Sequence, residues 1–111
     1  MAAEDEAHYR LMRLIEANPG MSQRDIAREL GMSLGKVNYC LRAVAAKGWI
    51  KATNFRNNHN KAAYLYWLTP RGMQMKARMT VRFLSIKMQE YESLRAEIEQ
   101  MKREAEGNPP G

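Results

Sequence analysis

The sequence is poor in cysteine, in long apolar runs and in the signals of a secreted chain. Cys40 is the one cysteine among 111 residues, which excludes an internal disulfide framework and favours a reducing compartment. No apolar run approaches the ~20 residues of a membrane-spanning helix. The N-terminus, with Glu4, Asp5 and Glu6, lacks the basic start and apolar stretch of a signal peptide. We therefore expect a cytoplasmic protein that does not bind membranes.

Acidic residues are missing altogether between Glu29 and Glu90. The sixty residues from Leu30 to Gln89 contain eleven basic ones, which are Lys36, Arg42, Lys47, Lys51, Arg56, Lys61, Arg71, Lys76, Arg78, Arg82 and Lys87. A soluble chain usually interleaves both signs, so a long block of one sign indicates a polyanionic partner. A merely solvated face is the alternative interpretation. Because the block covers part of a helix-turn-helix pattern and the hairpin after it, duplex DNA is favoured.

The constellations that catalysis requires are also missing. The sequence has no glycine-rich phosphate loop, clustered carboxylates, metal-ligand spacing or nucleophile–base pair. His59 has no second histidine or cysteine nearby, which disfavours a metal role. We therefore expect no cofactor, no bound metal and no enzymatic activity. The 45% apolar and 27% charged residues describe an ordinary globular domain with one extended element.

Three helices are predicted in the first half of the chain from apolar spacing and end signals. The first runs from Glu4 to Ala17 and stops at a proline–glycine pair. The second is short, is capped by Ser22 and ends at Gly31. The third is capped by Ser33 and closed by Gly48.

The segment from Gln23 to Arg42 matches a helix-turn-helix. Ala27 is the small residue where two such helices touch, and Gly31 tolerates the left-handed turn between them. Apolar residues that fix the crossing angle are expected at Ile26, Leu30, Met32, Val37, Cys40 and Leu41. An ordinary helical hairpin is the alternative. At its apolar position, Cys40 is interpreted as a small core residue rather than a redox sensor.

The outward face of the third helix carries the candidate DNA-binding residues. These are Ser33, Gly35, Lys36, Asn38, Tyr39 and Arg42. The first members are small, which allows close approach, and the later ones are rich in hydrogen-bond donors. Asparagine can form two hydrogen bonds with adenine in the major groove.

A two-stranded wing is predicted next. Its strands are Trp49 to Asn54 and Ala63 to Leu68, and the loop from Phe55 to Lys61 is rich in asparagine, which favours turns. Further candidate DNA contacts in this loop are Arg56, Asn57, His59 and Lys61. The aromatic residues Tyr64, Tyr66 and Trp67 are interpreted as packing rather than base-stacking residues.

One long helix follows, capped by Thr69 and running to Ala105. The predicted organisation is a DNA-binding domain over residues 1–68, a dimerisation helix over 69–105 and a disordered tail over 106–111. The expected fold class is mainly α with a small β-hairpin.

A heptad pattern beyond residue 83 predicts a parallel coiled coil with a second copy of the chain. Its apolar residues are Leu84, Met88, Tyr91, Leu94, Ile98 and Met101, with Lys87 interrupting one core position. In a parallel pair Glu90 would meet Arg95, and Glu97 would meet Lys102, of the other copy. The alternative is that the helix packs back onto its own domain.

These motifs resemble a known family. The segment Ser22 to Gly48, the hairpin and Leu68-Thr69-Pro70-Arg71-Gly72 are similar to the winged helix-turn-helix of MarR-type bacterial regulators. The residues 35–41, 54–57 and 60–61 more closely resemble a short branch associated with exopolysaccharide. The resemblance covers Tyr9 to about Met101 and implies a DNA-binding transcriptional regulator.

The chain departs from the family in two respects. The Asp-x-Arg wing signature of many relatives falls on Asn60-Lys61-Ala62, so that ion pair is missing. Further C-terminal helices that wall a ligand pocket in relatives are not found either, so a small-molecule effector is unsupported.

Taken together, the basic block, the helix-turn-helix and the heptad pattern predict a homodimeric regulator that reads a pseudo-palindromic operator. A winged-helix architectural or assembly module without its own operator is the alternative.

Overall fold

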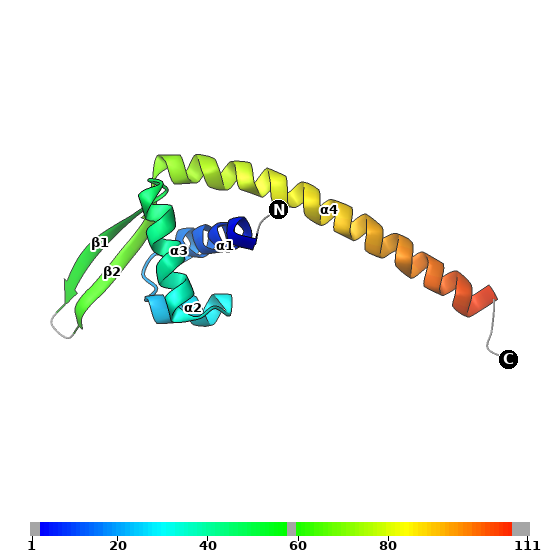
Figure 1. Ribbon diagram of the computed structural model, residues 1–111, viewed down its shortest axis with the longest axis horizontal. Helices are drawn as coiled ribbons and strands as arrows, with labels where there is room; N and C mark the ends of the chain where they lie inside the picture. Colours follow the sequence, from blue (N-terminus) through cyan, green and yellow to red (C-terminus); the bar gives the residue numbers. More distant parts are fainter. Residues whose placement is uncertain (1–2, 58–59, 108–111) are drawn as a thin grey trace. The chain divides into compact units, whose positions relative to one another are not determined.

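A computed structural model describes residues 3–57 and 60–107 of the chain. Its elements, in order along the chain, are α1 (Ala3–Ala17), α2 (Gln23–Leu30), α3 (Leu34–Ala46), β1 (Ile50–Asn57), β2 (Asn60–Leu68) and α4 (Pro70–Gly107) (Figure 1). The chain divides into two compact units at Met79. The first unit therefore contains the three short helices, the hairpin and the beginning of α4, which extends the compact part beyond Leu68.

The ends of α2 and α3 are set by residues that satisfy the free backbone groups there. The Ser22 hydroxyl accepts a hydrogen bond from the backbone N–H of Asp25 (3.1 Å), and Ser33 accepts one from Lys36 (3.1 Å). Gly31 closes α2 with φ +66°, a left-handed conformation that glycine adopts at little cost. Both predicted caps and the predicted turn are confirmed.

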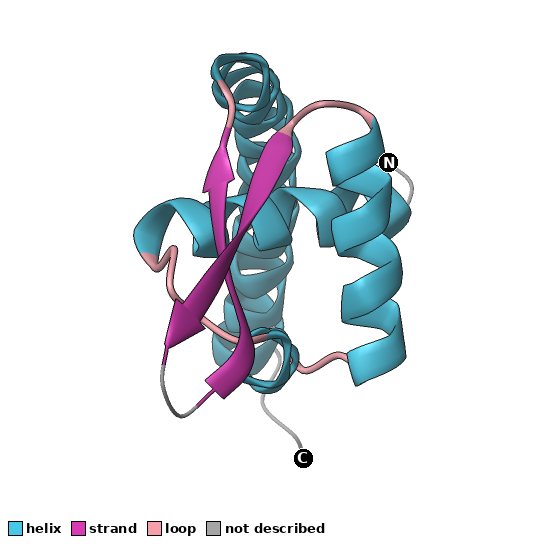
Figure 2. Cartoon of the chain, turned by 90° about the vertical axis from the view of Figure 1, so that its left-hand side faces the viewer, coloured by secondary structure: helices cyan, strands magenta, loops and turns pink. Residues whose placement is uncertain are grey.

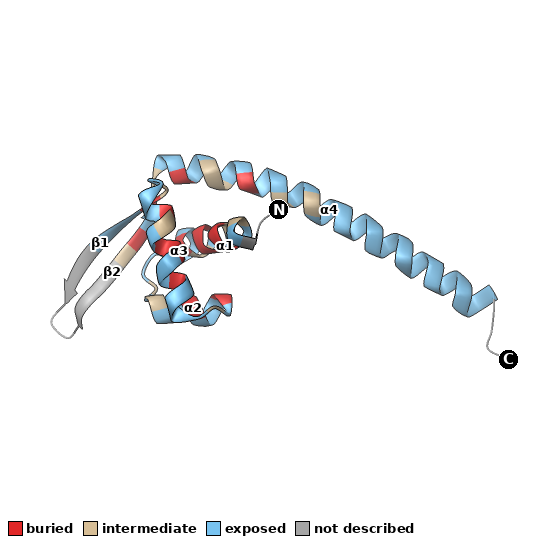
Figure 3. Cartoon of the chain, viewed as in Figure 1, coloured by how far each residue is buried: buried red, intermediate tan, exposed pale blue. Residues whose placement is uncertain are grey.

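The core of the first unit lies between α1, α2 and α3. The predicted core side of α3 is confirmed, because Val37, Cys40, Leu41 and Val44 are all buried (Figure 3). They meet Leu11, Met12 and Ile15 of α1 and Ile26, Ala27 and Leu30 of α2 in one apolar core. Met32 is only half-buried. The Cys40 thiol is 3% exposed, and burial raises its pKa, which disfavours the reactive thiolate.

The hairpin is longer than the sequence predicts. β1 and β2 pair in antiparallel register from Ile50↔Leu68 to Asn57↔Asn60, with an irregularity between Phe55 and Asn57 (Figure 2). The predicted loop, which placed residues 55–57 and 60–61 between the strands, is therefore wrong. Asparagine favours turns locally, but the cross-strand hydrogen bonds of a ladder already begun extend through these residues.

The start of α4 is joined to the end of α3 by the Leu-Thr-x-x-Gly element. The Thr69 hydroxyl accepts a hydrogen bond from the backbone N–H of Gly72 (3.0 Å) and donates one to the carbonyl of Gly48 (2.5 Å). The backbone N–H of Thr69 donates to the carbonyl of Trp49 (3.0 Å). Thr69 is thus the predicted cap of α4, and it also fixes the turn between α3 and β1.

Gly72 is required because α4 passes very close to this turn. A Cβ atom at Gly72 would lie 1.9 Å from the carbonyl oxygen of Trp49.

The far end of α4 lies beyond the predicted one. The helix continues through Gly107, so the prediction that residues 106–107 belong to a disordered tail is wrong. The remaining residues of that predicted tail, 108–111, lie outside the described residues.

One histidine is buried in the core of the first unit without a hydrogen bond. His8 is 1% exposed, and among the described residues neither ring nitrogen has a hydrogen-bond partner. Its Nε2 lies 3.8 Å from a Glu4 carboxylate oxygen, which is too far for a hydrogen bond. Burial, and secondarily the positive charge of Lys47, lower the pKa of His8 against the opposing charges of Glu4 and Asp5.

We expect His8 to make the fold sensitive to mild acid. Below about pH 6.5 the unfolded chain binds a proton at this histidine while the folded protein resists it, so stability falls as pH falls through that value. The slope is at most about 1.4 kcal/mol per pH unit. Denaturant unfolding of wild type and His8→Leu at pH 7.5 and 5.5 measures the contribution of His8, since every other titratable group is common to both proteins. An equal loss of stability in the two proteins between these pH values would contradict the role assigned to His8.

Candidate nucleic-acid interface

The outward face of α3 is exposed as the helical spacing predicts. Ser33, Gly35, Lys36, Asn38, Tyr39 and Arg42 are all exposed. An open hollow of about 420 Å³ is lined by Gly35, Asn38, Tyr39, Arg42 and Ala43. Tyr39 is 62% exposed despite its large ring. The structure thus brings Gly35, Asn38, Tyr39 and Arg42 together around one hollow, and it leaves Ser33 and Lys36 exposed nearby at the start of α3.

Gly35 has no structural requirement within the first unit. A Cβ atom at this position would meet no heavy atom within 4 Å, and its backbone is ordinary right-handed helix. Glycine in a helix is less favourable than alanine by about 0.5–1 kcal/mol. Its place beside the hollow leaves room for the backbone of α3 to approach another molecule closely.

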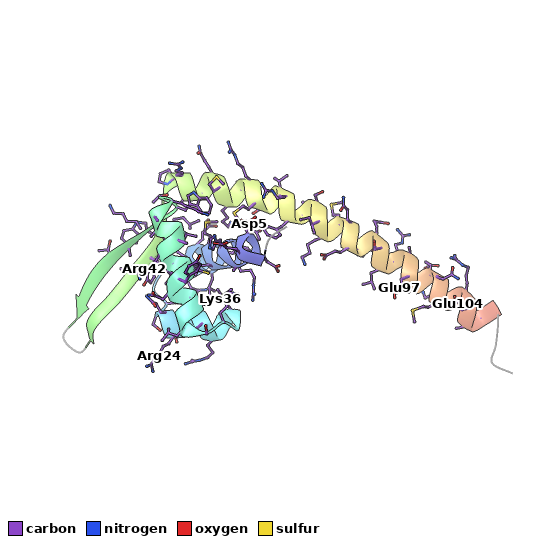
Figure 4. All side chains as sticks on the ribbon, in the orientation of Figure 1. Asp5, Arg24, Lys36, Arg42, Glu97 and Glu104 are labelled. Atoms are coloured by element: carbon purple, nitrogen blue, oxygen red, sulfur yellow. The ribbon has the colours of Figure 1, made fainter. Side chains whose placement is uncertain are left out.

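Positive charge on this face is not neutralised by the protein. Among the residues that the structure describes, no ion pair includes Lys36 or Arg42 of α3. Figure 4 shows both side chains on α3, and Arg24 on α2. Lys47, at the end of α3, lies over the ring of Trp49 with its Nζ 4.6 Å from the ring centroid. Lys36 and Arg42 are therefore available to an anionic partner.

The predicted wing contacts are only partly placed by the structure. Arg56 and Asn57 lie in β1, and Lys61 lies in β2, so these three are strand residues rather than loop residues. Their side chains, and His59 as a whole, lie outside the described residues. Within the hairpin, Tyr66 is buried in agreement with a packing role, whereas Trp67 is 39% exposed.

The sequence did not indicate that two residues of other elements are linked to this face, one directly and one through the other. The side-chain amide of Asn38 donates a hydrogen bond to Gln23 of α2 (3.3 Å), and Gln23 donates one to the hydroxyl of Tyr66 (3.1 Å). Gln23 begins α2, where a polar residue is unremarkable, so no local signal marks it. The contact depends on the crossing of α2 and α3, which tertiary packing sets.

The second unit exposes the apolar residues of the heptad pattern. Their exposed fractions lie between 43% and 62% for Leu84, Met88, Tyr91, Leu94, Ile98 and Met101. Figure 3 shows the later turns of α4 exposed along their whole length. Apolar residues repeated on one face of a long helix indicate a missing packing partner.

Two other kinds of site are absent from the described ranges 3–57 and 60–107. No group of three or more His, Cys, Asp or Glu residues there could hold a metal ion. Over the same ranges, no helix combines the length and the apolar character needed to cross a membrane.

Comparisons with known proteins agree with this geometry. Residues 4–51 match the family described as winged helix-turn-helix DNA-binding. No curated protein matches the chain in sequence. The solved structures with a similar fold include transcriptional regulators of the MarR type.

Three solved structures illustrate the likeness. The PcaV transcriptional regulator from Streptomyces coelicolor, solved with its natural ligand, is 18% identical with a TM-score of 0.67, and the match covers 96% of this chain and 77% of PcaV. The S. aureus MepR–DNA complex is 18% identical with a TM-score of 0.63, covering 96% and 79%. Wild-type MarR from E. coli is 20% identical with a TM-score of 0.58, covering 70% and 54%.

These likenesses establish the fold of the chain. It is a winged helix-turn-helix with a two-stranded antiparallel hairpin and a long C-terminal helix, as in MarR-like structures. The predicted fold class is therefore confirmed. The helix α3 corresponds to the second helix of the helix-turn-helix.

Proposed function

We propose that the protein is a homodimeric, sequence-specific transcriptional regulator that places α3 in the major groove of duplex DNA. The observation that carries the proposal is the accessible face of α3, with its hollow and with Lys36 and Arg42, which form no ion pair within the described part of the chain. The MepR–DNA complex supports it, since a protein of the same fold is bound to DNA there. A helix of this motif fits the width of the groove.

The residues of α3 have different proposed roles. Asn38 and Tyr39 read base edges, because they lie in the hollow and carry hydrogen-bonding groups. Lys36 and Arg42 contact phosphates, which position the helix without reading sequence. Ser33 and Gly35 permit close approach of the helix N-terminus. In the wing, the proposed phosphate or minor-groove contacts are Arg56, Asn57, His59 and Lys61.

The dimer is proposed to form through α4 beyond Met79. A parallel coiled coil would cover the exposed apolar residues and pair Glu97 with Lys102 of the second copy. Two copies related by a two-fold axis would read a pseudo-palindrome with half-sites about one helical turn apart. A single recognition helix contacts only a few base pairs, so the dimer supplies much of the specificity.

Binding is expected to depend steeply on salt and on sequence. Because neutralised phosphates release counterions, affinity for duplex DNA should fall about 10³-fold between ~50 and ~200 mM salt. Site selection from a random library, followed by competition with random duplex, measures the sequence preference. Salt-independent binding would contradict the phosphate contacts. Equal affinity for selected and random duplexes would instead identify an architectural or assembly module.

A finer proposal concerns the regulated genes. The resemblance of residues 35–41, 54–57 and 60–61 to the exopolysaccharide-associated branch supports a role in controlling exopolysaccharide-related genes. Genome-wide footprinting tests this directly, because bound sites should lie upstream of genes for polysaccharide synthesis or export. Footprints that avoid such genes would overturn this part while leaving the DNA-binding proposal intact.

A further inference from the structure

Three polar side chains from three elements form a connected chain beneath the face of α3. Asn38 on α3 donates a hydrogen bond from Nδ2 to Oε1 of Gln23 (3.3 Å). Gln23, the first residue of α2, donates from Nε2 to the hydroxyl of Tyr66 on β2 (3.1 Å). This hydrogen-bonded series thus runs from the exposed Asn38 through the half-buried Gln23 to the buried Tyr66.

Tyr66 is a firm anchor for this chain. Its side chain is 5% exposed, and its backbone N–H donates to the carbonyl of Pro19 (3.2 Å) in the connection between α1 and α2. The ring therefore has little freedom to move relative to α2. A hydroxyl held in this way restricts the position of the Gln23 amide.

The hydrogen bonds hold the Asn38 amide and leave part of it available to a second partner. The NH₂ group of Asn38 donates to the Gln23 oxygen. The Gln23 nitrogen then faces the Tyr66 hydroxyl, which can accept from it. With one N–H held by Gln23, Asn38 retains its oxygen as an acceptor and its second N–H as a donor. One acceptor and one donor are what asparagine uses to recognise adenine.

We propose that Gln23 is a positioning residue that orients the Asn38 amide for base readout, with Tyr66 as its anchor. The inference rests on the proposed DNA-binding function. It adds that sequence discrimination depends on a residue of α2 and one of the wing, neither of which has to touch DNA. Without Gln23, the amide of an exposed asparagine is free to rotate, and the preference for the correct base weakens.

The main test compares the affinity for the selected operator with the affinity for random duplex, at one salt concentration. Gln23→Ala is expected to lower this ratio about tenfold, within the range of one bidentate base contact, and to leave random-duplex binding unchanged. Asn38→Ala should lower the ratio at least as much. The double variant should lose no more than Asn38→Ala alone, because Gln23 acts through Asn38. Gln74→Ala, the same change at an exposed position of α4, is the matched control.

Two conservative variants separate positioning from a structural role. Gln23→Glu keeps an acceptor for Asn38 and can accept from the Tyr66 hydroxyl, so the ratio should stay within about twofold of wild type. The added negative charge should weaken binding to both duplexes. Tyr66→Phe keeps the ring but removes the hydroxyl, and should shift the Asn38 side-chain amide signals in the NMR spectrum of the free protein.

Each contrary result identifies a different error. Equal losses on operator and random duplex in Gln23→Ala would make Gln23 a phosphate or folding residue and overturn the proposal. Additive losses in the double variant would mean that Gln23 reads a base itself, which also overturns it. Unchanged Asn38 signals in Tyr66→Phe would remove the anchor. If the wild type shows no preference for any duplex, the proposed function fails together with this inference, whereas normal discrimination in Gln23→Ala refutes this inference alone.

Discussion

The double variant Leu94→Glu/Ile98→Lys is expected to form folded monomers that bind the operator about 10²–10⁴-fold more weakly than wild type. The two residues are 55% and 43% exposed and lie at the centre of the apolar stripe on α4. Burying charged side chains in a coiled-coil seam is strongly unfavourable. Once the two copies separate, each half-site is bound independently and the effective concentration of the second module is lost.

The measurement is sedimentation of the free proteins, followed by operator titration. A matched control is Ser93→Glu with Gln100→Lys, which introduces the same two charges at outer positions of the same heptads. The control should remain a dimer and bind normally. Because residues 80–111 form a separate unit, the first unit should unfold normally in both variants. Wild-type protein that sediments as a monomer at roughly tens of micromolar, without DNA, would contradict the coiled coil.

The helical part of the fold could be predicted because its signals are local. Ser22 and Ser33 cap their helices through backbone groups three residues away, and Gly31 closes α2 with its own left-handed conformation. The outward face of α3 follows from helical spacing alone, so its exposed residues were predictable too. None of these features depends on a distant part of the chain.

The wing and the support beneath the site could not be predicted as well, because they depend on long-range contacts. Asn57 and Asn60 favour turns, yet strand pairing that begins at Ile50↔Leu68 places them in the ladder. Gln23 meets Tyr66 across 43 residues of sequence, and the pattern around neither residue reveals the contact. His8 is a different case, because helical spacing places it on the same face as Leu11, Met12 and Ile15. Histidine is only intermediate in its tendency to be buried, so the residue type did not single it out.

The Leu-Thr-x-x-Gly element could be predicted only in part. Its sequence predicts that Thr69 caps α4, and the hydrogen bond from the Gly72 N–H confirms this. The reason for the glycine emerges only from the structure, because the atom that would collide with a side chain belongs to Trp49, in a different element. This close approach makes Gly72 the residue whose substitution should damage the fold most.

Gly72→Ala is expected to destabilise the first unit by about 3 kcal/mol or more, at the upper end of what overpacking costs. The added Cβ would lie 1.9 Å from the Trp49 carbonyl oxygen and 2.8 Å from its carbon. Both are backbone atoms, so no side chain can rotate away, and α4 itself must shift. That shift would also disturb the hydrogen bonds that Thr69 makes to Gly48 and Trp49. For a unit of this size the melting temperature should fall by roughly 12–24 °C.

Gly35→Ala provides the matched control, because it is the same substitution in the first turn of another helix. Nothing lies within 4 Å of its added Cβ, so stability should be unchanged or should rise by up to about 1 kcal/mol. Thermal unfolding of the two variants at equal concentration makes the comparison. The essential result is that the two substitutions change the melting temperature in opposite directions, since helix propensity alone would stabilise both variants. If Gly72→Ala melts within a few degrees of wild type, α4 does not pack against the turn as closely as the structure places it.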